Sequence, residues 1–190
     1  MRRAIHAGGS TLVEVLVALL LLALGLLGGS AMHLSSLRAR HESALLSQAV
    51  QQAASMAERM RANSAVMQAP DADNPYLGLD YEAGPSEGGA DVAASCLGAG
   101  ACDAAQLAQF DIAEWKRQLR TALPGARLRI CRDTQAWDVA AQGLQWQCSG
   151  GSGAPIVIKL GWRGRPAAGR AAHDASALPG IAMQLAGGVP

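Results

Sequence analysis

The chain has 190 residues, of which 50% are hydrophobic and only 4% aromatic, and its formal net charge at pH 7 is +1. A charge so close to zero provides no bulk attraction for nucleic acid, so we expect no nucleic-acid partner. The length fits one compact domain and one additional segment, and the scarcity of aromatic side chains predicts a modest core.

The additional segment is an apolar run near the N-terminus that contains a carboxylate. Residues 12–29 read LVEVLVALLLLALGLLGG, and the stretch from Val15 to Met32 approaches the ~20 apolar residues that span a bilayer. An ionised Glu14 inside such a run costs roughly 2.5–3.5 kcal/mol on insertion scales, so we expect the protein to supply a partner for it. Residues 10–32 are therefore predicted to form a membrane-spanning helix.

A cleaved secretory signal is the alternative interpretation of this run. Arg2 and Arg3 would form its basic region, and small residues around Ser30 would provide a cleavage site behind the apolar core. The carboxylate within the core and the lack of a helix stop after Met32 favour a retained anchor.

Residues 33–67 predict that the helix continues beyond the apolar run. The sequence has no Pro or Gly between His33 and Pro70. Apolar side chains recur at helical spacing on one face, at Leu34, Leu37, Leu45, Ala49, Ala53, Met56 and Met60. We therefore expect one helix from Thr11 to Met67 that is apolar all round at first and amphipathic afterwards.

The junction that precedes the run carries a family resemblance. Gly9-Ser10-Thr11-Leu12-Val13-Glu14, behind a short basic leader, resembles the processing signal of type IV pilins and type II secretion pseudopilins. In that family a prepilin peptidase cuts after the glycine, methylates the new N-terminus and leaves a glutamate as the fifth residue. The resemblance implies a leader over residues 1–9, cleavage between Gly9 and Ser10, N-methylation of Ser10, and Glu14 as the family's glutamate. Most members have Phe or Met where this chain has Ser10.

The resemblance also implies a partner for Glu14. In the pilin family the glutamate is thought to pair with the N-terminal amine of a neighbouring subunit during assembly. Such a pair would fix the stagger of the subunits, because any other register leaves both charges uncompensated in an apolar environment. A glutamate tolerated near the lipid headgroups is the alternative.

Residues 68–190 are expected to form a globular domain that starts with a long loop. Residues 68–109 are rich in Gly, Ala, Asp and Pro and show no sustained helical or strand period. A second helix is predicted from Phe110 to Leu123, where Pro124-Gly125 stops it.

Alternating or apolar stretches then predict an antiparallel sheet. The candidate strands are ARLRICRD (residues 126–133), GLQWQCS (143–149), APIVIKLGW (154–162) and IAMQL from Ile181. Arg127, Arg129 and Arg132 are expected on a solvated strand face, with a partner-facing patch as the alternative. The order of elements predicts an α+β fold in which the sheet covers the amphipathic half of the long helix.

The globular part adds to the resemblance. A tryptophan-bearing helix that ends in Leu-Pro-Gly, Ile130-Cys131-Arg132, a second cysteine at Cys148 and Gly161-Trp162-Arg163 look like parts of the PilV-type minor pilins, the type IV pilus modification proteins. The resemblance implies the pilin fold and a role, with other minor pilins, in initiating pilus assembly. Its implied partners are the prepilin peptidase, other minor pilins, the major pilin and the inner membrane. The implied location is a single pass through that membrane, with a cytoplasmic N-terminus and a periplasmic domain, and afterwards the pilus.

Four cysteines follow the apolar run, at Cys96, Cys102, Cys131 and Cys148. If this run carries the domain across a membrane, the thiols reach an oxidising compartment and pair there. Four cysteines allow three connectivities. The short spacing within the loop favours Cys96 with Cys102, and the ends of two predicted strands favour Cys131 with Cys148, while the other connectivities stay open.

Catalytic and metal sites are not expected, nor is a cofactor or a small-molecule substrate. His173 is the only histidine beyond His41 and lies in a loop-like tail, so a Ser/His/Asp triad lacks a positioned base. The cysteines lack the paired spacing of a zinc site, and GGSG at residues 150–153 lacks the lysine of a phosphate loop.

Two functions of different classes fit these observations. The first is a structural assembly protein, a minor pilin, with a type II secretion pseudopilin as its close relative. The second is a signal-anchored periplasmic binding or adhesive domain that does not polymerise. Cleavage between Gly9 and Ser10 separates the two, because only the first requires it.

Overall fold

The structure, a computed structural model, describes residues 11–84, 96, 102–151, 153–163 and 178–185. The chain divides into two compact units, residues 1–41 and 42–190. Helix α1 (Leu12–Ala62) contributes residues to both units. The second unit also contains α2 (Ser64–Met67), the 3-10 helix η1 (Asp71–Asp73), β1 (Asp80–Glu82), α3 (Ala104–Ala122), β2 (Arg127–Arg132), β3 (Trp137–Asp138), β4 (Gly143–Leu144), β5 (Ile156–Gly161) and β6 (Ile181–Gln184).

The second unit is built on a four-stranded antiparallel sheet with the strand order β1-β2-β5-β6. Its central pair places Leu128 opposite Leu160 and Ile130 opposite Ile158, and these four side chains are fully buried in the core. Successive strand residues point to opposite faces, so the four define an inner face, and the intervening residues define an outer face. The predicted α+β class and the predicted last strand are confirmed.

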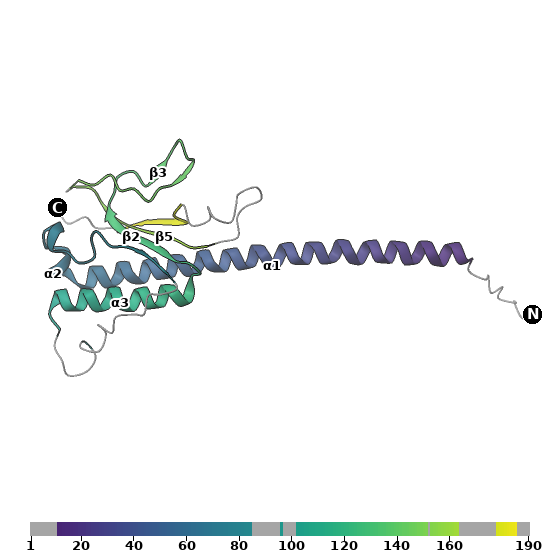
Figure 1. Cartoon of the computed structure of the whole chain (residues 1–190), viewed down its shortest axis with the longest axis horizontal. Coiled ribbons are helices and arrows are strands. Elements are labelled where there is room, and N and C mark those ends of the chain that lie inside the picture. Colours follow the sequence, from purple (N-terminus) through teal and green to yellow (C-terminus); the bar gives the residue numbers. More distant parts are fainter. Residues whose placement is uncertain (1–10, 85–95, 97–101, 152, 164–177, 186–190) are drawn as a thin grey trace, which may run out of the picture. The chain divides into compact units, whose positions relative to one another are not determined.

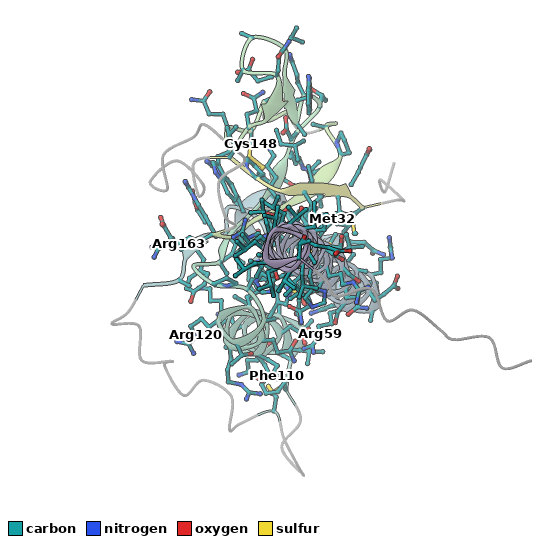
Figure 2. All side chains as sticks on the ribbon, turned by 90° about the vertical axis from the view of Figure 1, so that its right-hand side faces the viewer. Met32, Arg59, Phe110, Arg120, Cys148 and Arg163 are labelled. Carbon is teal, nitrogen blue, oxygen red and sulfur yellow. A yellow bond between two sulfur atoms is a disulfide. The ribbon has the colours of Figure 1, made fainter. Side chains whose placement is uncertain are left out.

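Residues 42–62 of α1, here called its second part, form the middle layer of this unit. Figures 1 and 2 show it with α3 on one side and the sheet on the other. Its buried side chains are small or flexible: Leu45, Ala49, Ala53, Met56, Ala57 and Met60 are at most 7% exposed. Alanines let neighbouring elements come close, and methionines fill the irregular spaces that remain. The predicted apolar face is therefore confirmed from residue 45 onward.

Trp115 joins α3 to α1. Its indole is fully buried, and its Nε1 donates a hydrogen bond to the carbonyl oxygen of Gln52 at 3.1 Å. Leu119 and Leu123, each one helical turn further along, are also fully buried. The helix ends where the sequence predicts, because Gly125 has a φ of +57°, a left-handed conformation that glycine adopts without strain.

A buried polar network connects α1, α3 and the segment after η1. Arg59 Nη1 lies 3.0 Å from Asp111 Oδ1, and the Tyr76 hydroxyl donates to Asp111 Oδ2 at 3.1 Å. Burial raises the pKa of Tyr76 to about 12, against an opposing hydrogen bond from Asn63 and with the help of the Asp111 charge. The phenol therefore remains a hydrogen-bond donor throughout the physiological pH range.

The long helix ends earlier than expected. α1 stops at Ala62 and α2 begins at Ser64, because Asn63 leaves the helical region with φ −90° and ψ 62°. The side-chain Nδ2 of Asn63 donates to the carbonyl oxygen of Ala104 at 2.7 Å. The expectation of one helix to Met67 is wrong, because this tertiary hydrogen bond competes with continuation of the helix.

The expected loop over residues 68–109 contains regular structure. Both η1 and β1 lie within it. β1 becomes an edge strand of the sheet, with the buried Tyr81 opposite Leu128. A strand this short shows no recognisable period in the sequence. It forms because it pairs with β2.

α3 also begins inside that expected loop, at Ala104 and not at Phe110. Asp103 Oδ1 accepts from the Gln106 amide at 2.7 Å, and Gln106 Oε1 accepts from the Asp103 amide at 3.1 Å. This reciprocal pair is a capping box, which satisfies two of the free N–H groups at a helix start.

The predicted strand GLQWQCS, residues 143–149, does not join the four-stranded sheet. Its first two residues form β4, which pairs with β3 in a separate two-stranded ribbon. Residues 145–149, here the crossing segment, lie over the outer face of the sheet. The Trp146 ring covers Gly161 there, so closely that a Cβ on Gly161 would lie 2.8 Å from it, and the Arg127 guanidinium is 4.5 Å from the ring centroid.

Lys159 of β5 binds the crossing segment to the outer face. Its ammonium donates to the carbonyl oxygens of Gln145 at 2.7 Å and Gln147 at 2.6 Å, and it lies 2.6 Å from Asp133 Oδ2. Both charged side chains are fully buried. The two carbonyl oxygens accept hydrogen bonds from the ammonium, and the Asp133 carboxylate compensates its charge through the ion pair. This explains why every residue of β5 is buried although its outer face carries a lysine.

Replacing Gly161 with alanine should destabilise the protein. The new Cβ would lie 2.8 Å from the Trp146 ring, so the ring or the strand must shift, at a cost of about 1–3 kcal/mol. Urea unfolding of the full chain in detergent micelles measures this loss. Gly153→Ala is the control, because its Cβ would meet nothing within 4 Å, and it should change stability by less than about 0.5 kcal/mol. Equal effects of the two variants would contradict the packing of Trp146 on Gly161.

Candidate functional site

The first unit contains an apolar helix segment that no described residue covers. The exposed large apolar side chains of this segment, each at least 47% accessible, are Leu12, Val13, Val15, Leu16, Val17, Leu19, Leu20, Leu21, Leu22, Leu24, Leu26, Leu27 and Met32. The most apolar 18-residue window of α1 has a mean hydropathy of 2.5, so the helix is long and apolar enough to cross a membrane. An apolar surface of this extent needs lipid or other protein around it.

Glu14 and His33 are the ionisable residues that bound this segment, because none lies between them in the sequence. Ser30 is polar, but its hydroxyl donates to the carbonyl oxygen of Leu26 at 2.8 Å. The helix therefore satisfies this hydroxyl internally, as a helix in a lipid environment requires.

Gly25 and Gly29 form a shallow notch on the same segment, lined also by Leu26, Ser30 and His33. A Cβ on either glycine would meet nothing within 4 Å. Small residues four positions apart allow a second helix to approach closely in lipid. The notch is thus compatible with helix packing, without defining a partner.

Glu14 lies in the first turn of α1. Its backbone N–H donates to the carbonyl oxygen of Thr11 at 3.0 Å. Among the described residues, no basic side chain forms an ion pair with its carboxylate. The helix N-terminus stabilises a carboxylate by about 0.3–1 kcal/mol, which is less than the insertion cost of about 2.5–3.5 kcal/mol. A further positive partner is therefore needed if this turn enters an apolar environment.

The predicted cleavage junction between Gly9 and Ser10, the N-methylation position Ser10 and the leader over residues 1–9 lie outside the described residues. Of the processing and assembly residues, only Glu14 is described. These assignments stay predictions.

The second unit contains two disulfides. They join Cys131 to Cys148, with 6.3 Å between the Cα atoms, and Cys96 to Cys102, with 5.5 Å. These are the two pairings that the sequence favoured. Disulfides form and persist in oxidising compartments, so they indicate an extracytoplasmic domain.

The arginines expected on a solvated strand face are partly exposed, and each pairs with an acidic residue of the same unit. Arg127 and Arg129 lie 3.8 and 3.5 Å from the Asp80 carboxylate. Arg132 binds Asp71 through two hydrogen bonds of 2.6 and 2.7 Å, and these bonds lower the pKa of the Asp71 carboxyl. Their acidic partners come from the segment that the sequence predicted as a loop.

Sequence reasoning missed Lys159 and Asp133, the most deeply buried ion pair among the described residues. One signal was present: a single lysine interrupts the apolar stretch PIVIKLG, residues 155–161. A lysine within a continuous apolar strand cannot reach solvent on either face of that strand. Its charge therefore needs an acidic or carbonyl partner. The identity of that partner depends on the crossing segment, which no local pattern reveals.

Comparison with protein-family models, with curated proteins and with solved structures finds no match to this chain. A long helix, apolar in its first part and packed through its second part on an antiparallel sheet, in a chain with two disulfides, is a pilin-like arrangement.

Acidification should weaken the domain through Asp133. Burial raises the pKa of this carboxyl, but hydrogen bonds from Lys159 and from the Gln135 and Ser149 amides outweigh burial and leave the pKa below its usual value. A carboxyl with a depressed folded pKa stabilises the fold above its unfolded pKa of about 3.9, and this contribution is lost as the pH falls through the folded value. Urea midpoints measured from about pH 7 down to about pH 2.5 should fall across that window.

Asp133→Asn isolates this contribution, because Asp71 and Glu114 also have lowered pKa values and add their own pH dependence. The variant should be less stable at neutral pH by roughly 3–5 kcal/mol, since Lys159 loses its anionic partner. Its stability should also fall less steeply with acid than that of the natural chain. Parallel pH profiles for the two proteins would refute the assignment.

Proposed function

We propose that the chain is a minor pilin of a type IV pilus that helps to initiate pilus assembly, as the resemblance to PilV-type proteins implies. The observation that carries this proposal is the division of α1: one part is apolar, exposed and bounded by a carboxylate, and the other is built into a disulfide-bonded α+β domain. Such a helix serves two environments in turn. Lipid covers its apolar part before assembly, and neighbouring helices cover it afterwards.

Glu14 is the proposed assembly contact. Cleavage after Gly9 would create a charged amine on Ser10, and methylation would keep that charge. The amine of a neighbouring subunit would then supply the positive partner that Glu14 lacks among the described residues. Because an unpaired charge in an apolar environment is costly, this pairing favours one stagger between subunits.

The disulfides support the proposed location. In this proposal the N-terminus is cytoplasmic, the apolar segment crosses the inner membrane once, and the domain oxidises in the periplasm before the protein enters the pilus. The prepilin peptidase, the other minor pilins and the major pilin are its proposed partners. No catalytic role or cofactor is proposed.

The mature chain should begin at Ser10 with a methylated amine and should stay in the membrane fraction when assembly partners are absent. Mass spectrometry of the N-terminal peptide decides this, because a type II pseudopilin shares the cut whereas a signal-anchored domain lacks it. A mature N-terminus near Ser30, or soluble periplasmic protein, would contradict the proposal. Deleting the pilus genes and the secretion genes separately would then separate the pilin from the pseudopilin.

Replacing Glu14 with alanine or glutamine should leave cleavage intact but reduce incorporation into pili about tenfold or more, because the amine of the neighbour loses its counter-charge. Quantitative immunoblots of sheared pili and of membranes measure the ratio. Glu42→Ala is the control, since Glu42 is exposed in the polar part of α1, and it should incorporate normally. Normal incorporation of both Glu14 variants would remove the pairing argument.

A further inference from the structure

Beside the packing of Trp146 on Gly161, two contacts that share one covalent loop attach the crossing segment to the sheet. The Cys131–Cys148 disulfide closes this loop. The loop supplies the three oxygens nearest the Lys159 ammonium: the ion-paired Asp133 Oδ2 near one end, and the hydrogen-bonded Gln145 and Gln147 carbonyl oxygens near the other. Lys159 itself lies outside the loop, in a central strand of the sheet. One ammonium group therefore binds both ends of the loop.

Each contact depends on the other. When the disulfide opens, the two ends of the loop keep only non-covalent contacts, such as the hydrogen bond from the Ser149 amide to Asp133 Oδ1 at 3.2 Å, and an ammonium that loses its acceptors is costly to keep buried. When Lys159 is removed, Asp133 and two carbonyl oxygens lose their partner in a buried place. Figure 2 shows Cys148 on the side of the sheet away from α1. The core between the sheet and α1 therefore cannot take over the role of the disulfide or of the Lys159 contacts.

The loop carries the β3–β4 ribbon, which extends beyond the sheet (Figure 1). A ribbon with two residues in each strand is not stable by itself in water. Its turn is held locally, by Asp138 Oδ1 accepting from the Ala140 amide at 2.8 Å. Trp137 and Val139 are 52% and 76% exposed. The position of this apolar tip therefore depends on the attached ends of the loop, together with Leu178, whose Cδ1 would lie 3.3 Å from a Cβ on Gly143 of β4.

We propose that the Cys131–Cys148 disulfide and the Lys159 ammonium form one redox-dependent latch. Oxidation fixes the loop on the outer face and presents the β3–β4 ribbon, whereas reduction releases both and leaves the four-stranded sheet folded. Reduction converts the disulfide to two thiols, with two electrons and two protons supplied by a dithiol that itself becomes a disulfide. The Cys96–Cys102 disulfide belongs to a different segment and takes no part.

The latch can be tested on the full chain in detergent micelles. In Cys131→Ser/Cys148→Ser, the acetylation rate of Lys159, followed by peptide mass spectrometry, should rise about tenfold or more, and the amides of β3 and β4 should exchange faster. The amides of Ile130 and Ile158 should stay protected. Cys96→Ser/Cys102→Ser is the matched control and should leave Lys159 protected.

The converse variant, Lys159→Met, keeps the disulfide and removes the ammonium. It should also accelerate amide exchange in β3 and β4. If the disulfide alone held the ribbon, removal of the ammonium would leave this exchange unchanged. This arm decides the question even if the double serine variant loses its sheet. Protection of Lys159 in a folded double serine variant, or unchanged β3–β4 exchange in Lys159→Met, would overturn the latch.

Discussion

The rest of the second unit depends on one constraint: α3 and the sheet must approach the second part of α1 closely. Ala49, Ala53 and Ala57 recur every four residues and are almost fully buried, so they add little bulk between the layers. Dispersion contacts weaken steeply when a gap opens, so α3 on one side and the sheet on the other must both pack closely on this slender part of the helix. The fully buried Trp115 supplies the bulk that the alanines lack. A core with so few aromatic residues is sufficient because its middle layer is thin.

Lys159 meets a different requirement on the outer face. The crossing segment is not a strand of the sheet, so its buried carbonyl groups have no ladder partners and need another donor. The ammonium provides that donor for two of them and neutralises Asp133 at the same time. An apolar pair of similar volume, in place of both Lys159 and Asp133, could give equal stability. It would not, however, determine which carbonyl groups lie over the strand.

The sequence predicts those features that follow from local patterns of apolar residues. The buried face of α1 from Leu45 onward, the apolar face of α3 and strand β2 repeat at the period of their element, whereas the apolar segment of α1 and strand β5 are nearly continuous apolar runs. The start of α3 at Ala104 was missed, although Asp103 and Gln106, the two residues of its capping box, are three positions apart in the sequence. The end of α1 at Asn63, strand β1 and the path of the crossing segment could not be predicted, because tertiary hydrogen bonds, pairing with β2 and a disulfide decide them. For the candidate site, Glu14 follows from the sequence, whereas the Lys159–Asp133 pair depends on residues 26 positions apart.

The sheet order has a consequence for biosynthesis. β5 lies between β2 and β6, so the central pair of the sheet joins two strands that are separated in the chain by the β3–β4 ribbon and the crossing segment. One edge of the sheet, β6, is formed by nearly the last described residues. Sequence-distant pairing of this kind cannot begin until both partners are present. When the chain is synthesised from its N-terminus, the buried face of α1 emerges first and remains without its cover until β5 has followed. The apolar stripe from Leu45 to Met60 is then a transient hazard for aggregation.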